Sequence, residues 1–167
     1  KYYEKMRTKL LLPLLFLALF TFQANAQEVG DIRLGGGLVF GTSTFADLGL
    51  NVRGDYQFTE TIKGGVDFTY FFANEFYSLS TVNLNGFYYF DAEGFNPYAL
   101  AGINISIYSF PSFTGENASF TDVSLNLGGG ADFPISENLA AFGEVKYVVS
   151  GIDQLVLTGG VKFLLGN

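Results

Sequence analysis

Basic and acidic side chains recur on one side of a two-residue alternation through most of the sequence. In residues 48–58, apolar side chains and one glycine occupy the even positions, while polar side chains, Arg53 and Asp55 among them, occupy odd ones. Successive side chains of a β-strand point to opposite faces, so this pattern predicts a strand with one apolar and one charged face. Opposite charges on one face can pair or exchange protons. The parity holds for nine charged residues: Arg33, Arg53, Asp55, Lys63, Asp67, Asp132, Glu144, Lys146 and Lys162.

Ion pairing is the favoured use of these charges, and catalysis is not. The sequence has no histidine and no cysteine, and proton transfer near neutral pH most often uses imidazole. A carboxylate such as Asp55 or Asp67 could serve instead, but each has cations on the same face, which favours an ion pair. We therefore expect no enzyme, no catalytic residue and no cofactor. No metal site is expected either, because coordination spacing is lacking among the acidic residues Asp47, Glu75, Glu116 and Asp153.

Strands must position these faces, and the chain divides into eight of them. Each expected strand has roughly ten residues and is bounded by turn-forming clusters. The expected strands are Ile32–Phe40, Leu48–Phe58, Ile62–Phe72, Thr81–Phe90, Tyr98–Tyr108, Asp122–Phe133, Leu139–Val149 and Leu155–Leu165. In the fifth strand, Tyr98 and Leu100 lie in one phase and Ile103 lies in the other, so a β-bulge is expected near Gly102. The longest connection is expected at Ser109–Thr121.

Residues 1–26 are predicted to hold upstream residues and a secretory signal peptide. A basic stretch precedes the apolar run Leu10–Phe22, and Ala24 and Ala26 fit a small-x-small cleavage site. The run has 13 residues, whereas a membrane-spanning helix needs about 20. The rest of the chain, residues 27–167, is expected to form one exported domain.

Cleavage after the predicted signal peptide would make the domain strongly acidic. The whole chain has nine basic and sixteen acidic residues. Four of the basic residues but only one acidic residue precede the cleavage site, so five basic against fifteen acidic residues give a net charge of −10. Nucleic-acid binding needs Lys and Arg to neutralise phosphates, so a nucleic-acid partner is not expected.

Two kinds of barrel fit eight half-apolar strands. A soluble ligand carrier would turn its charged face to water, where about a quarter to a third of surface residues are normally charged. Here the polar face is mostly Gly, Asn, Thr and Ser with nearly balanced charges, which favours an enclosed interior. The apolar face ends in aromatic residues at both ends, as in transmembrane barrels. These predicted girdles are Phe58, Phe90, Phe133 and Phe163 at one rim, and Phe40, Tyr70, Phe72 and Tyr147 at the other.

Three motifs carry a resemblance to a known family. Residues 96–102 read Asn-Pro-Tyr-Ala-Leu-Ala-Gly, and residues 142–147 read Phe-Gly-Glu-Val-Lys-Tyr. With the strand count, they resemble the OmpA-like porin family. The resemblance implies an all-β, eight-stranded antiparallel up-and-down transmembrane barrel in the outer membrane of a Gram-negative bacterium, after Sec-type export. The last strand is similar to the signal read by the barrel-assembly machinery, carried by Thr158, Gly160, Phe163 and Leu165.

The expected role is that of a monomeric, non-catalytic component of the envelope, surrounded by outer-membrane lipid. An eight-stranded barrel is about wide enough to be filled by its own side chains, so the nine charged residues are expected to fill it. Two other roles stay open. One is a narrow, low-conductance pore formed when the ion pairs rearrange. The other is binding of a surface ligand through Ser109–Thr121, which carries Phe110, Phe113 and Phe120.

Overall fold

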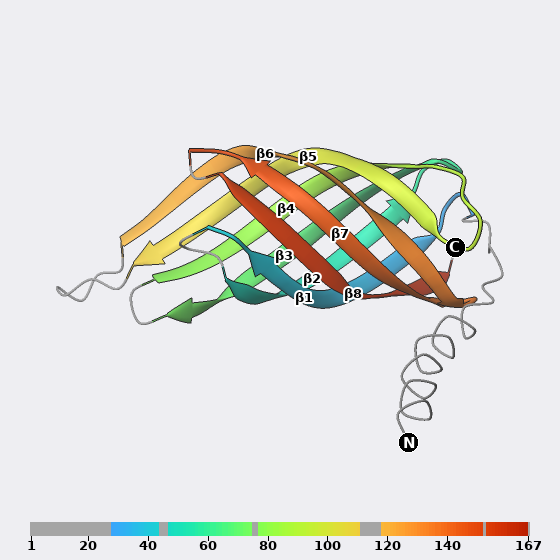
Figure 1. Ribbon diagram of the computed structural model, residues 1–167, viewed down its shortest axis with the longest axis horizontal. Coiled ribbons are helices and arrows are strands. Elements are labelled where there is room, and N and C mark those ends of the chain that lie inside the picture. Colours follow the sequence, from blue (N-terminus) through green and yellow to red (C-terminus); the bar gives the residue numbers. More distant parts are fainter. Residues whose placement is uncertain (1–27, 44–46, 75–76, 111–117, 152, 167) are drawn as a thin grey trace, which may run out of the picture.

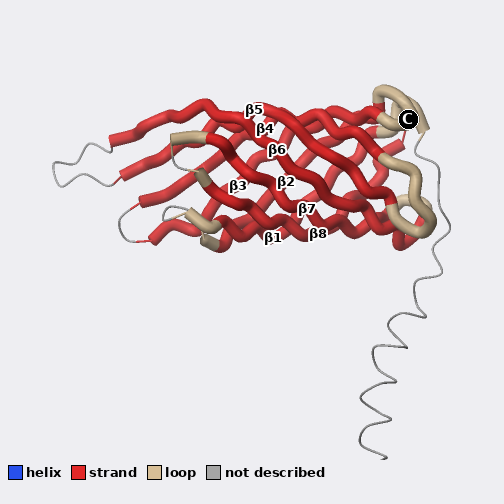
Figure 2. The backbone as a smooth tube through the Cα atoms, turned by 45° about the horizontal axis from the view of Figure 1, so that its top comes forward, coloured by secondary structure: helices blue, strands red, loops and turns tan. Residues whose placement is uncertain are grey.

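The chain folds into a closed β-barrel (Figure 1). The computed structural model describes residues 28–43, 47–74, 77–110, 118–151 and 153–166. Each strand pairs antiparallel with the next along the chain, and the first and last strands pair to close the cylinder. Figure 2 shows the described part as strands joined by short connections. No helix among the described residues is long and apolar enough to cross a membrane.

The eight strands confirm the predicted fold class, and their bounds differ little from expectation. They are β1 Ile32–Gly41, β2 Leu48–Gln57, β3 Ile62–Asn74, β4 Tyr77–Tyr89, β5 Asn96–Phe110, β6 Ala118–Ser136, β7 Leu139–Val149 and β8 Gln154–Gly166. The largest differences are an earlier start of β4 and an extension of β6 at both ends. The predicted signal peptide, with Ala24 and Ala26, lies outside the described residues.

The two ends of the barrel differ. We call the end with the connections 58–61, 90–95 and 137–138 the turn end, and the end with the connections 42–47, 75–76, 111–117 and 150–153 the loop end. The described chain begins and ends at the turn end (Figure 1). All four connections at the loop end join an odd-numbered strand to the next even-numbered one, as up-and-down topology requires.

The alternation of apolar and polar residues along the strands places apolar side chains on the outer surface and polar side chains in the lumen. Among the described strand residues, none that faces outward carries a charge. Large apolar side chains cover the outer surface, with Leu50, Val52 and Leu84 each at least half exposed. Charged and amide side chains face the lumen, where most are buried. The cylinder is therefore apolar outside, and its buried charges lie inside.

The expected β-bulge near Gly102 is wrong. β5 keeps an unbroken register with β4 and with β6 through this residue. Tyr98 and Leu100 face the lumen, where they form a buried cluster with Phe87 and Tyr89. The change of phase in the sequence thus comes from apolar residues on the inner face and not from an inserted residue.

The expected long loop at Ser109–Thr121 is partly strand. β5 continues to Phe110 and β6 begins at Ala118, and these two residues pair. Phe113 lies outside the described residues. The β5–β6 hairpin reaches farther from the barrel than the connection between β7 and β8 (Figure 1).

Candidate functional site

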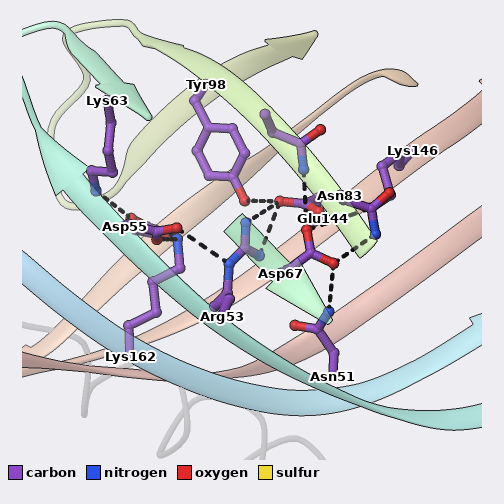
Figure 3. A network of polar contacts seen from close by, with 12 residues as sticks. Asn51, Arg53, Asp55, Lys63, Asp67, Asn83, Tyr98, Glu144, Lys146 and Lys162 are labelled. Carbon is purple, nitrogen blue, oxygen red and sulfur yellow. Dashed lines mark hydrogen bonds and ion pairs between the residues drawn. The ribbon is translucent and has the colours of Figure 1, made fainter. Parts of the chain in front are cut away.

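The lumen holds a network of ion pairs and hydrogen bonds that crosses the barrel (Figure 3). All nine charged residues predicted for the interior lie in ion pairs no longer than 3.8 Å. In all but the pair of Arg33, the paired side chains are at most 5 % exposed. Isolated buried charge is costly, so these pairs set the geometry of the interior.

Lys162 joins two carboxylates near the turn end. Its ammonium nitrogen lies 2.8 Å from Asp132 Oδ1 and 3.3 Å from Asp55 Oδ2. Asp132 also lies 3.7 Å from the Lys63 ammonium and accepts a hydrogen bond of 2.8 Å from the hydroxyl of Tyr89. Two cations therefore share two carboxylates, and this group of four residues is neutral as a whole.

Arg53 extends the same network toward the middle of the lumen. Its Nε lies 3.6 Å from Asp55, and both terminal nitrogens donate to Glu144 Oε2 at 3.1 Å. Glu144 accepts a further hydrogen bond of 2.9 Å from the Tyr98 hydroxyl. The guanidinium group also lies over the ring of Phe142, with 4.8 Å between its central carbon and the ring centroid. Contacts of this kind hold the Arg53 side chain in one position.

Asp67 is surrounded mainly by amides. Asn51 and Asn83 donate to its Oδ1 at 2.9 and 2.8 Å, and Asn85 donates to its Oδ2 at 3.1 Å. Its cation, Lys146, lies farther away at 3.8 Å. The carboxylate charge is thus met by several hydrogen bonds as well as by an ion pair.

Some members of this network were not expected from the sequence. Arg33 pairs with Asp31 at 3.6 Å, and Asp31 directly precedes β1, outside the predicted strand, although it shares the parity of Arg33. Tyr98 was not assigned to the lumen because of the expected bulge. From the sequence, the amides around Asp67 are expected only to dilute the charges of the inner face. Their odd positions on β2 and β4 were the available signal.

Glycines on the inner face make room for the ionic side chains. A Cβ built on Gly65 would contact Asp55 Oδ1 and lie 3.1 Å from the ring of Phe87. A Cβ on Gly130 would lie 2.7 Å from the Tyr98 hydroxyl. Side chains at these positions would compete with the network for the limited width of an eight-stranded barrel.

Between the polar network and the loop end, an apolar layer fills the lumen. Its members come from six of the eight strands, so the layer reaches across the whole lumen. Leu79 and Val39 are at most 1 % exposed. Phe110 packs against this layer, which consists of Val39, Phe71, Leu79, Tyr108, Val148 and Val156.

The described acidic residues fall into three zones. Five lie with the five cations in the lumen, namely Asp31, Asp55, Asp67, Asp132 and Glu144. Three of the described ones belong to the loop end, namely Asp47, Asp122 and Asp153. Five belong to the turn end, namely Glu28, Glu60, Asp91, Glu93 and Glu137. Among the described residues, the charges of the lumen are balanced, and each end carries acidic residues without a Lys or Arg.

Aromatic side chains ring both ends of the outer surface. The eight predicted girdle residues are 38 to 57 % exposed: Phe40, Phe58, Tyr70, Phe72, Phe90, Phe133, Tyr147 and Phe163. At the turn end, Tyr56 and Tyr88 extend the ring through edge-to-face contacts with Phe58 and Phe90. These tyrosines and Phe95, which stacks on Phe133, were not predicted as girdle residues.

The residues of the predicted assembly signal divide between the two faces of β8. Phe163 and Leu165 point outward and are exposed, while Thr158 faces the lumen and is buried. Gly160 also faces the lumen, where it lies against the backbone of Gly36. Within the described part of the chain, no group of three or more His, Cys, Asp or Glu residues is arranged to hold a metal ion.

Comparison with known proteins identifies the fold. No protein-family model and no curated protein sequence matches the chain. Among solved structures, it is similar to the N-terminal barrel domain of Pseudomonas aeruginosa OprF, with a TM-score of 0.71 at 14 % identity over 83 % of this chain and 100 % of that one. It is also similar to Neisserial surface protein A, with a TM-score of 0.62 at 17 % identity over 81 and 97 % of the two chains.

A third similar structure is Ail, the attachment invasion locus protein of Yersinia pestis. Its TM-score is 0.59 at 19 % identity, over 83 % of this chain and 100 % of that one. Ail has also been determined in a phospholipid bilayer nanodisc and in complex with the heparin analogue sucrose octasulfate. The closed cylinder, its apolar exterior and these likenesses together show that the chain has the fold of the eight-stranded outer-membrane β-barrels.

Proposed function

We propose that the protein is a monomeric, non-catalytic component of the outer membrane of a Gram-negative bacterium, with a lumen that is closed to ions. The observation that carries this proposal is the distribution of charge. Among the described residues, the five cations all lie inside the barrel, and the outward strand faces carry none. An uncharged band between aromatic girdles suits the hydrocarbon core of a bilayer.

An outer-membrane location agrees with three further features. The predicted signal peptide would export residues 27–167, and the pattern at the end of β8 resembles the signal for barrel assembly. The exterior also suits lipid, the environment in which the similar protein Ail was studied as a nanodisc. A soluble carrier would instead expose Leu50 and Val52, each at least half accessible, to water.

A closed lumen is favoured over a narrow pore because two different barriers lie in series. The ionic network occupies the turn-end half and the middle of the lumen, where Lys162 and Arg53 each touch two carboxylates. The apolar layer around Leu79 occupies the loop end. An ion would have to break buried pairs and then cross a layer whose side chains are apolar apart from the Tyr108 hydroxyl.

A non-catalytic role agrees with the way the interior carboxylates are held. Each of them lies within 3.8 Å of a cation, and Glu144, Asp67 and Asp132 also accept hydrogen bonds. A general base needs access to a substrate as well as a suitable position. The apolar layer stands between these carboxylates and the loop end.

Ail has been determined in complex with the sulfated ligand sucrose octasulfate. We do not expect this chain to bind such a ligand. Recognition of sulfate groups favours Arg or Lys side chains. Among the described residues, the loop end of this chain has acidic residues and no Lys or Arg. A polyanion would therefore be repelled there.

Cell fractionation and heat-modifiable gel mobility test the location and the closed barrel together. We expect the protein in the outer-membrane fraction, with an unheated form that migrates differently from the boiled form. Purified protein in a planar bilayer should then give no current above background. Recovery in a soluble fraction would contradict the membrane assignment, and steady unitary currents from the folded protein would contradict the closed lumen.

A further inference from the structure

β6 has an open edge at the loop end. On one side, its loop-end part pairs with β5 without a break as far as Ala118, which lies opposite Phe110. On the other side its pairing with β7 begins only at Leu125, opposite Val149. In the part of the chain that the structure describes, no strand pairs with this second edge over residues 118–124.

This open edge projects beyond the outer aromatic ring. Leu127 of β6 pairs with Tyr147 of the loop-end girdle. Thr121 lies six residues farther along the strand, which is roughly 20 Å at 3.3 Å per residue. The projecting β5–β6 hairpin is visible in Figures 1 and 2. The edge therefore stands on the water side of the loop-end girdle.

The edge lacks the features that usually block pairing with another strand. Residues 118–124 read Ala-Ser-Phe-Thr-Asp-Val-Ser, with no proline and no lysine. Exposed edges are normally protected by such residues, by bulges or by covering segments. The register of β5 with β6 is unbroken here, so no bulge twists the edge away. Phe120 and Val123 are 57 and 67 % exposed on its two faces.

The acidic residues near the open edge of β6 indicate which kind of strand would pair with it. Asp122 lies in the edge itself, and the described residues of the loop end include Asp47, Asp122 and Asp153 but no Lys or Arg. A cationic segment would be attracted, and an acidic one repelled. A second copy would bring the same acidic surface. If it stood in the same membrane with the same orientation, its β6 would also run parallel to this one, which is the less stable pairing.

We propose that residues 118–124 of β6 form a docking edge, to which an extended polypeptide segment rich in Lys or Arg adds as a further strand. Backbone hydrogen bonds would hold the segment in register, and alternate side chains would face Phe120 and Val123. This inference goes beyond the proposed envelope role, because it concerns peptide binding at the loop end and not the closure of the lumen. The two can be tested separately, since peptide binding is measured on folded protein in micelles.

The test uses the folded protein in zwitterionic micelles and a labelled peptide, Lys-Val-Lys-Val-Lys-Val-Lys. We expect saturable binding by fluorescence anisotropy. Hydrogen exchange should slow at amides within residues 118–124. The same peptide with alternate backbone nitrogens methylated keeps its charges but cannot pair on that edge, and we expect its affinity to fall by about tenfold or more.

Matched lysine variants separate pairing at the edge from general attraction. Through their common partners on β5, Ser119 and Thr121 on the open strand lie level with Ser78 and Ser80 on β4. Because β4 lies between β3 and β5, it has no open edge there. The double variant Ser119→Lys/Thr121→Lys should weaken peptide binding by about tenfold, because like charges would stand directly opposite one another. Ser78→Lys/Ser80→Lys adds the same charge away from the edge and should weaken it much less.

Several results would overturn the docking edge. One is that the methylated and unmethylated peptides bind with equal affinity. Another is that the two double variants lose the same amount of peptide affinity. A third is that no binding is seen at about 1 mM peptide. Protection of residues 118–124 that rises with protein concentration in the absence of peptide would assign the edge to a second copy instead. Heat-modifiable mobility of each variant establishes that it is folded before binding is measured.

Discussion

Arg53 and Glu144 meet across the lumen although 91 residues separate them in the chain. They belong to β2 and β7, which are not neighbours in the barrel. Both terminal guanidinium nitrogens donate to one carboxylate oxygen at 3.1 Å, and both side chains are 2 % exposed. This contact ties opposite parts of the wall together inside a medium that screens charge poorly.

Glu144→Gln should destabilise the folded barrel because it leaves Arg53 buried with only the more distant Asp55. Removing one partner of a buried pair costs about 3–5 kcal/mol, and we expect a value near the lower end because Asp55 remains 3.6 Å away. Urea unfolding in lipid vesicles measures the change. Glu137→Gln at the exposed turn end is the control, with a change within about 0.5 kcal/mol. A Glu144→Gln variant as stable as the parent would contradict a structural role for the pair.

Val52→Arg tests whether the outer face contacts lipid. Val52 is 58 % exposed near the middle of β2, so an arginine there would enter hydrocarbon. We expect the free energy of unfolding to fall by about 2–4 kcal/mol, as for cations near the bilayer midplane. Thr121→Arg, beyond the girdle, should cost about 0–1 kcal/mol. Equal stability of the two variants in vesicles would show that Val52 does not lie in the membrane.

Much of the fold could be predicted because a barrel of this kind repeats one simple rule. Side chains alternate between lipid and lumen, so the parity of Arg53, Lys63 and Lys146 already separates the two faces. The rule fails where the lumen itself is apolar. Tyr98 and Leu100 satisfy the parity of the inner face, but their apolar character suggested a change of register that does not occur.

The partners within the lumen could not be predicted. Which cation meets which carboxylate depends on the tilt of the strands and on their register, as the contact between Arg53 and Glu144 illustrates. Asp31 was not predicted because it directly precedes the expected strand Ile32–Phe40, although it shares the parity of Arg33. The inclusion of Val39 and Leu79 in the apolar layer could not be predicted, because they are ordinary strand residues that join one cluster only when the sheet closes.

Gly65→Ala should disturb the network through a single methyl group. The added Cβ would meet Asp55 Oδ1 and the Phe87 ring, so Asp55 would have to move away from Lys162. Overpacking of this kind costs about 1–3 kcal/mol, measured as the free energy of unfolding in urea. Gly143→Ala is the matched control because a Cβ there meets nothing within 4 Å. The same loss in both variants would mean that the effect comes from strand propensity and not from the network.

Conductance of the lumen should appear only when both barriers are opened. Phe71→Gly/Leu79→Gly removes bulk from the apolar layer but leaves the ion pairs. Arg53→Ala/Glu144→Ala removes the ion pair in the middle of the lumen but leaves the apolar layer. We expect each double variant to stay silent in a planar bilayer and the quadruple variant to pass current. Leu84→Gly, at an outward position that is 62 % exposed, is the control for a weakened wall. Each variant is first checked for heat-modifiable mobility. Current through either double variant alone would show that one layer closes the lumen by itself, and current through the control would place the path outside the lumen.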